Sequence, residues 1–98
     1  MSYKFKSQVV IWPGETANWY FAYVPQKMAL TLSQRYDKMH RGWRSLPVEA
    51  KVGQTAWRTS IFYDKRSNTY ILPIKAQVRK KEGIYDKDSI NLTLKIVL

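Results

Sequence analysis

The stretch YILPIKAQVRKKEGIYDKDSINLTLKI, residues 70–96, carries the signals that decide the fold. Its apolar start ends at Leu72-Pro73, as a strand does when proline removes the next backbone donor. We expect one or two helical turns over residues 75–81, ended by Gly83, which can take a left-handed conformation. From Ser89 to Leu98, apolar and polar residues alternate with period two. This period predicts a half-buried strand, so the stretch is a strand–helix–turn–strand unit.

The same alternation recurs on the N-terminal side of this unit. Residues 47–52 and 55–63 alternate, and the tetrapeptide VGQT between them predicts a tight turn with Gly53 at positive φ. Met28, Leu32 and Tyr36 recur every four residues after Pro25 and predict a helix. Further strands are expected near residues 5–11, 19–24 and 70–72. With 98 residues, the chain has room for one core. We therefore expect a single, mostly β domain over residues 1–98.

The composition excludes several classes of protein. Hydrophobic residues make up 45% of the chain, too many for a disordered tail. No apolar run approaches the ~18 residues of a membrane span, and the N-terminus lacks the features of a signal peptide. The chain has no cysteine, which excludes disulfides, thiolate nucleophiles and cysteine-ligated zinc. These features predict a cytoplasmic protein that has no membrane partner.

The charge is strongly basic, with 17 Lys and Arg against 7 Asp and Glu, a net charge of +10. The excess is spread over both halves of the chain, so it is not a detachable tail. A folded body of this charge favours anionic partners such as nucleic acid, an acidic protein or a lipid surface. The alternative is that the charge only aids solubility.

No catalytic set is evident. His40 is the only histidine, and Asp37, three residues earlier, would pair with it only if that segment were helical. The four glycines are isolated, so no glycine-rich phosphate loop is present. A metal site needs several suitable ligands. We therefore predict a protein that is not an enzyme and has no metal and no cofactor.

Aromatic residues are interleaved with basic ones, which is typical of sites that hold single-stranded nucleic acid. Trp43 lies between two arginines in RGWRSL and is the expected exposed stacking residue, whereas Trp57 and Trp19 are expected in the core. The same cations could also be the solvated side of a connector. The predicted phosphate contacts are Lys75, Arg79, Lys80, Lys81, Arg41, Arg44 and Arg58.

The order of four motifs is familiar: WxFxxVP (19–25), LPV (46–48), WRTSIF (57–62) and YILPIKAQVRKKEGI (70–84). Together they resemble a bacterial family of small β-barrel domains of unknown function, whose members often lie beside a bacteriocin-protection (OmpD-associated) domain. The resemblance covers about residues 3–97 and implies a closed barrel of six or seven strands with one or two short helices. Family members usually have Gly-Asp before the last strand. Here Lys87-Asp88 takes that place, so we expect another turn conformation.

Residues 70–96 also resemble the strand–Pro–helix–Gly–strand unit of AbrB-type swapped-hairpin barrels, which bind DNA and would favour a dimer. Two strand–Pro–helix units in one chain, at Pro25 and Pro73, favour a monomer instead, which we expect. Nucleic-acid binding is the first hypothesis for function. A barrel lined by Trp57, Tyr70 and Trp19 could alternatively hold a small anionic ligand. A third hypothesis is an interaction module that acts with the bacteriocin-protection type of domain.

Overall fold

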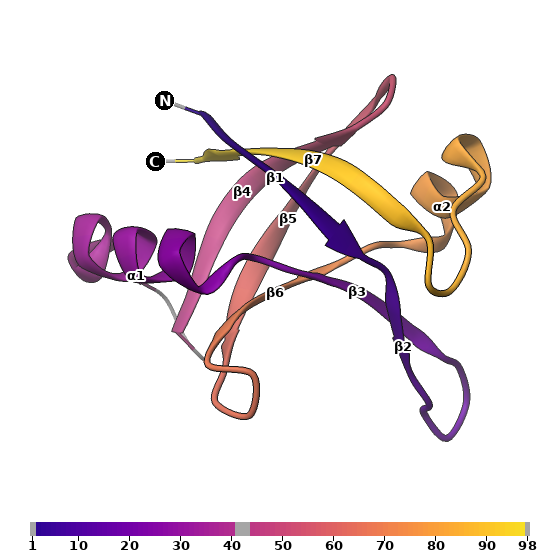
Figure 1. Cartoon of the computed structure of the whole chain (residues 1–98), viewed down its shortest axis with the longest axis horizontal. Coiled ribbons are helices and arrows are strands. Elements are labelled where there is room, and N and C mark those ends of the chain that lie inside the picture. The colour runs from indigo at the N-terminus through magenta and orange to yellow at the C-terminus, as the bar shows by residue number, and fades with distance from the viewer. Residues whose placement is uncertain (1, 41–43, 98) are drawn as a thin grey trace.

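The computed structural model describes residues 2–40 and 44–97 and consists of one curled sheet with helices at its ends (Figure 1). The helices are α1 (Gln26–Arg35), α2 (Ala76–Glu82) and a short 3₁₀ helix, η1 (Asp37–Met39). The strands are β1 (Ser2–Gln8), β2 (Val10–Trp12), β3 (Trp19–Tyr23), β4 (Ser45–Val52), β5 (Thr55–Asp64), β6 (Thr69–Pro73) and β7 (Ser89–Ile96).

The seven strands are all antiparallel, in the order β1-β7-β4-β5-β6-β3-β2. The predicted turn between β4 and β5 is confirmed: Val52 pairs with Thr55, and Gly53 has φ of +57°. The predicted strand at the C-terminus is confirmed too, because Ile90, Leu92 and Leu94 are buried while the residues between them are not. Period-two patterning therefore located the central strands correctly.

The sheet is a curled half-barrel that does not close, so the expectation of a closed barrel is wrong. β1 and β2 stand at the two ends of the strand order, although only Val9 separates them in the sequence. β1 pairs with β7, whereas β2 pairs with β3. Within residues 2–40 and 44–97, no ladder joins β1 to β3, but the Tyr23 N–H donates a hydrogen bond to Ser7 Oγ at 2.9 Å. The chain changes its pairing partner at Val9 instead of completing a ring.

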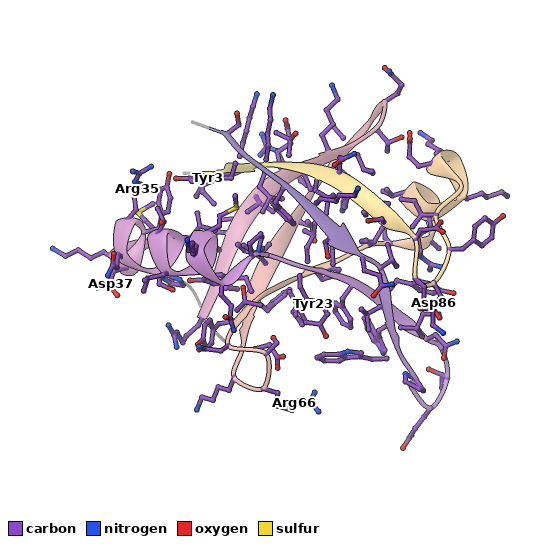
Figure 2. All side chains as sticks on the ribbon, viewed as in Figure 1. Tyr3, Tyr23, Arg35, Asp37, Arg66 and Asp86 are labelled. Atoms are coloured by element: carbon purple, nitrogen blue, oxygen red, sulfur yellow. The ribbon has the colours of Figure 1, made fainter. Side chains whose placement is uncertain are left out.

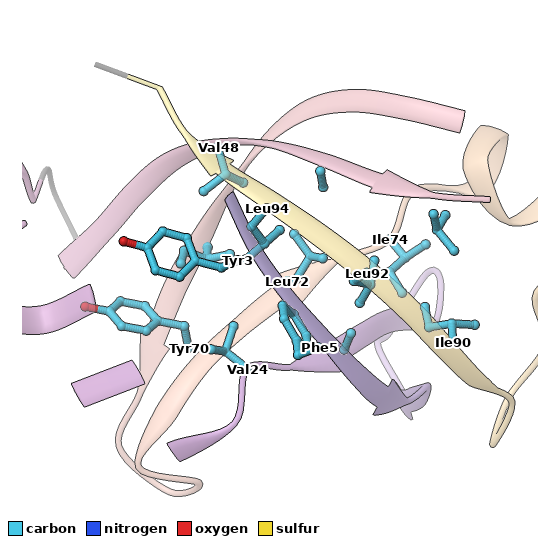
Figure 3. Packing of buried hydrophobic residues seen from close by; sticks show 14 of the residues in the cluster. Tyr3, Phe5, Val24, Val48, Tyr70, Leu72, Ile74, Ile90, Leu92 and Leu94 are labelled. Carbon is cyan, nitrogen blue, oxygen red and sulfur yellow. The ribbon is translucent and has the colours of Figure 1, made fainter. Parts of the chain in front are cut away.

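The concave face of the sheet holds the core (Figure 3). Phe5, Leu72, Leu92 and Leu94 meet there, and Tyr70 reaches in from the side of α1. Full burial of each leucine stabilises the fold by roughly 1.5–3 kcal/mol. The convex face carries the alternate, polar residues of the same strands.

The helices lie at opposite ends of the half-barrel (Figure 1). α1 is the helix predicted after Pro25; Ala29 and Leu32 are buried, with Met28 and Tyr36 packed beside them. α2 is the short helix predicted over residues 75–81. It buries Val78 and ends at Gly83, whose φ of 63° is left-handed as predicted. α2 packs near β5, which positions the pocket described next.

Candidate functional site

The candidate site is a pocket at the place where β5 and β6 separate. β5 pairs with β4 over residues 55–62, but it pairs with β6 only over residues 62–64. On its other edge, β6 pairs with β3 from Ile71 to Pro73, so it continues past the point where its ladder with β5 ends. Trp57 to Thr59 of β5 therefore face Pro73 to Lys75 with no ladder between them, and the start of β3 completes the wall. The divergence of two paired strands creates the hollow.

The pocket has a volume of about 270 Å³, and its lining combines aromatic and cationic side chains. Trp57 is buried at its base, and Trp19 is 60% exposed at its rim. None of the lining residues is acidic, and in the described part of the chain no carboxylate forms an ion pair with its three cations. The aromatic members are Trp19, Tyr20 and Trp57, and the cationic members are Arg58, Lys75 and Arg79.

Arg79 is held in a fixed orientation at this pocket. Its Cζ atom lies 3.6 Å from the centre of the Tyr20 ring, and its Nε donates to the Ile74 carbonyl at 3.1 Å. Lys75 is the N-cap residue of α2 and lies four residues before Arg79, so both cations lie on one side of this helix. The stacking and the Nε bond orient the guanidinium while its two terminal nitrogens can reach a ligand.

Lys80 and Lys81 do not line this pocket, although they belong to the same cationic run. Both are exposed in the last turn of α2, where positive charge complements the helix dipole. Glu82, the next residue of the helix, accepts a hydrogen bond from the Thr55 hydroxyl at 2.6 Å. The run is thus divided between the pocket and the end of the helix.

Arg44 lies at the other end of the molecule. Its Cζ atom is 4.1 Å from the centre of the Tyr63 ring, in a depression lined by residues of α1. Figure 2 shows Asp37 at the α1 end and Asp86 near α2, so the two ends are well separated. Arg41 and Trp43 lie outside the described residues. The predicted residues therefore do not all form one face: Arg58, Lys75 and Arg79 come together, and Arg44 is elsewhere.

The two tryptophans predicted in the core behave differently. Trp57 is 7% exposed, as predicted, whereas the prediction for Trp19 is wrong. Trp19 opens β3 opposite Trp12 of the end strand β2, and among residues 2–40 and 44–97 no further strand covers that side. An uninterrupted apolar run such as WYFAYV has no alternation to show which member is exposed. The exposed tryptophan of the pocket was thus missed by sequence reasoning.

Tyr70 does not join this pocket. Its hydroxyl lies 2.9 Å from Ser33 Oγ and 2.6 Å from His40 Nε2, and burial raises the pKa of the phenol above its usual value. His40 Nδ1 lies 3.2 Å from the main-chain oxygen of Asp37, so His40 contacts the backbone of Asp37 at this atom and not its carboxylate. This cluster holds η1 against the core.

Comparison with known protein families gives a match over most of the chain. A family model described as "Domain of unknown function (DUF1905)" matches residues 5–94. No curated protein matches the chain significantly. Among the described residues, no group of three or more His, Asp or Glu side chains is arranged to hold a metal ion, and no helix is long and apolar enough to span a bilayer.

Proposed function

The chain belongs to the DUF1905 family, whose description assigns no activity, and we propose that it binds single-stranded nucleic acid without catalysing a reaction. One observation carries the proposal: Arg58, Lys75 and Arg79 line the same pocket as Trp19, Tyr20 and Trp57, with no acidic residue among the lining side chains. Aromatic faces that stack bases, beside cations that bind phosphates, are the two components of single-strand recognition.

The pocket size supports one planar ring as its occupant. Its volume of about 270 Å³ lies just below the range of roughly 300–1,000 Å³ that is usual for drug-sized ligands. A base can stack on the exposed face of Trp19 while its phosphate contacts Lys75 or Arg79. A base inside a duplex is already stacked and paired, so an unpaired strand is the preferred form.

The main test is fluorescence anisotropy with labelled single-stranded DNA, single-stranded RNA and duplex DNA, each at about 50 and 200 mM salt. A Lys75→Ala/Arg79→Ala variant should weaken single-strand binding by about tenfold or more, because it removes two phosphate contacts. The matched control is Lys80→Ala/Lys81→Ala, which removes the same charge from the same helix outside the pocket. Equal effects of the two variants would show that only net charge matters.

The stacking role has its own control pair. Trp19→Ala should weaken binding by about 1–3 kcal/mol, the usual contribution of one stacked base. Trp19 is 60% exposed, so this change should leave the fold intact. Tyr85→Ala removes another exposed aromatic side chain, 73% exposed, which does not line the pocket. It should leave affinity unchanged, and a similar loss in both variants would contradict stacking in the pocket.

A small anionic ligand is the second candidate, favoured by the buried base of the pocket at Trp57. Adenosine monophosphate measured by calorimetry separates the two functions. If the mononucleotide binds as tightly as an oligonucleotide, with little dependence on salt, the pocket is a small-molecule site. If affinity requires the oligonucleotide and falls steeply with salt, nucleic acid is the ligand.

A further inference from the structure

The convex face of the sheet carries a second set of cations that no motif in the sequence brings together. Lys4 and Lys6 are exposed on β1, Lys95 on β7, Lys51 on β4 and Arg58 on β5. Directly paired residues of an antiparallel sheet point to the same face. Lys4 pairs with Thr93, Thr93 with Lys51, and Lys51 with Ala56. In the next row, Ser2 pairs with Lys95, Lys95 with Glu49, and Glu49 with Arg58.

These registers place the five cations on one continuous path. Lys6 and Lys4 are two residues apart on β1, and Lys4 is a diagonal neighbour of Lys95. Lys95 is likewise diagonal to Lys51, and Lys51 to Arg58. Diagonal neighbours in an antiparallel sheet are about 7–8 Å apart. The path crosses four strands and ends at Arg58, which also lines the pocket.

Almost nothing on this face opposes the positive charge. On the same face of β5, Asp64 stands at the far end of the strand, where its Oδ1 lies 3.9 Å from Arg66 Nε. Glu49, between Lys95 and Arg58, is the one carboxylate within the path itself among the described residues. It forms no ion pair with either neighbour in that part of the chain. The residues between and beside the cations are small, such as Asn91, Thr93 and Ala56, so they offer no bulky side chain that would block an extended chain.

We propose that this path, Lys6–Lys4–Lys95–Lys51–Arg58, is the track along which the phosphate backbone of a single-stranded nucleic acid leaves the pocket. The inference rests on the proposed function, since Arg58 joins the track to the pocket. The nucleic acid crosses the β-strands, from β5 over β4 and β7 to β1. At the spacing of sheet strands and residues the track is roughly 20 Å long. It therefore adds several phosphate contacts that a dinucleotide held in the pocket does not reach.

The test compares a labelled dinucleotide with an octanucleotide across a series of salt concentrations. The track variant is Lys4→Gln/Lys6→Gln/Lys51→Gln/Lys95→Gln. The matched control is Lys27→Gln/Lys38→Gln/Lys65→Gln/Lys80→Gln, which removes four exposed lysines away from the track. The track variant should bind the dinucleotide normally and lose the extra affinity for the octanucleotide. Each lost phosphate contact lowers the salt slope by about 0.7, so the slope should fall by roughly 2–3.

Glu49→Gln should change octanucleotide affinity in the direction opposite to the track variant. Removing the carboxylate from the track should strengthen octanucleotide binding about two- to fivefold and leave the dinucleotide unchanged. Equal behaviour of the track and control variants, with no effect of Glu49→Gln, would overturn the track while pocket-dependent binding survives. Octanucleotide binding that needs the track lysines but not Lys75, Arg79 or Trp19 would instead overturn the proposed pocket. Equal displacement of the octanucleotide by heparin and by unlabelled octanucleotide would overturn the assignment to nucleic acid.

Discussion

Lys87 adopts a backbone conformation that suits glycine. Its φ is 69°, in the turn that connects α2 to β7. The Lys87 N–H donates to the Val9 carbonyl at 2.9 Å, and Gln8 Nε2 donates to the Lys87 carbonyl at 3.3 Å, so the fold on both sides holds the turn. The resemblance places glycine here, and we expected lysine to change the turn. The observed left-handed φ shows that Lys87 adopts the conformation that glycine would favour, with the strain that its Cβ causes there.

Lys87→Gly should therefore stabilise the protein. A Cβ in the left-handed region costs roughly 1–2 kcal/mol, which glycine avoids. Glycine also has more conformational freedom in the unfolded chain, and this offsets a part of the gain. We expect the free energy of unfolding in urea to rise by about 0.5–1 kcal/mol. Lys87→Ala removes the charge but keeps the Cβ, so it should give no such gain. Equal stabilisation by both variants would mean that the charge, not the backbone, is responsible.

Individual side chains were predictable where the sequence alternates and not elsewhere. Trp57 follows a strict alternation and is buried as expected, whereas Trp19 lies in an uninterrupted apolar run and is exposed. The division of the cationic run of α2 between the pocket and the helix end could not be predicted from the sequence either. Lys75 and Arg79 are four residues apart and share a side of the helix, which sequence spacing alone reveals only when the helix limits are known.

At the scale of elements, Gly53 connects the β4–β5 turn with α2. Its φ of +57° is left-handed, and a Cβ there would lie 2.0 Å from Glu82 Oε1. That carboxylate accepts a hydrogen bond from the Thr55 hydroxyl at 2.6 Å. This bond attaches the end of α2 to the start of β5. The turn glycine thus leaves room for the contact that positions the wall of the pocket.

Gly53→Ala should destabilise the fold and loosen the pocket together. The left-handed strain and the displaced Glu82 bond should lower the free energy of unfolding by about 1–3 kcal/mol, measured in urea. Thr55→Val removes the same bond without strain and should cost less, about 1 kcal/mol. Both changes should weaken oligonucleotide binding, because they release α2 from β5. Normal affinity in a folded Gly53→Ala protein would show that the α2 wall is not needed.

The pocket itself could not be predicted from the sequence. The strands that form it were predicted, and so was the helix that precedes Gly83. The hollow arises because the β5–β6 ladder ends at Phe62 and Ile71, whereas β6 stays paired with β3 on its other edge as far as Pro73. Where a ladder ends depends on the whole sheet. Local patterns specify which face of a strand is buried, but they do not specify where two strands part.

For the molecule as a whole, the main difference from expectation is the open sheet. Alternation and turn residues predicted the central strands, but the single strand expected near residues 5–11 is divided at Val9 into β1 and β2. These patterns also contained no information on whether the first and last strands of the sheet would pair. Val9 explains the outcome: its N–H donates to the Asp88 carbonyl at 2.7 Å, which continues the pairing of β1 with the β7 side. The next residue, Val10, already pairs with Phe21 of β3. Because the chain bends at Val9, the segments on its two sides form the two end strands of the sheet, and no ladder joins these two strands among the described residues.

This arrangement gives Ser7 a role in the whole fold. Ser7 is 9% exposed, and its Oγ accepts the Tyr23 N–H at 2.9 Å where β1 passes β3. Ser7→Ala would leave that partly buried N–H without its acceptor, which costs about 1–3 kcal/mol. A small domain has only about 5–15 kcal/mol of net stability, so the loss should be clear in urea denaturation.

Hydrogen exchange decides whether this bond holds the two ends of the sheet together. In Ser7→Ala, the Tyr23 amide should exchange faster along with the amides of β2, because the end of the sheet can then open locally. The control Ser2→Ala changes an exposed serine of the same strand and should alter neither stability nor exchange. If Tyr23 stays protected in Ser7→Ala, the two ends of the half-barrel are held by the covalent link through Val9 and by packing alone. The hydroxyl would then be dispensable, and the open sheet would need no hydrogen bond across its gap.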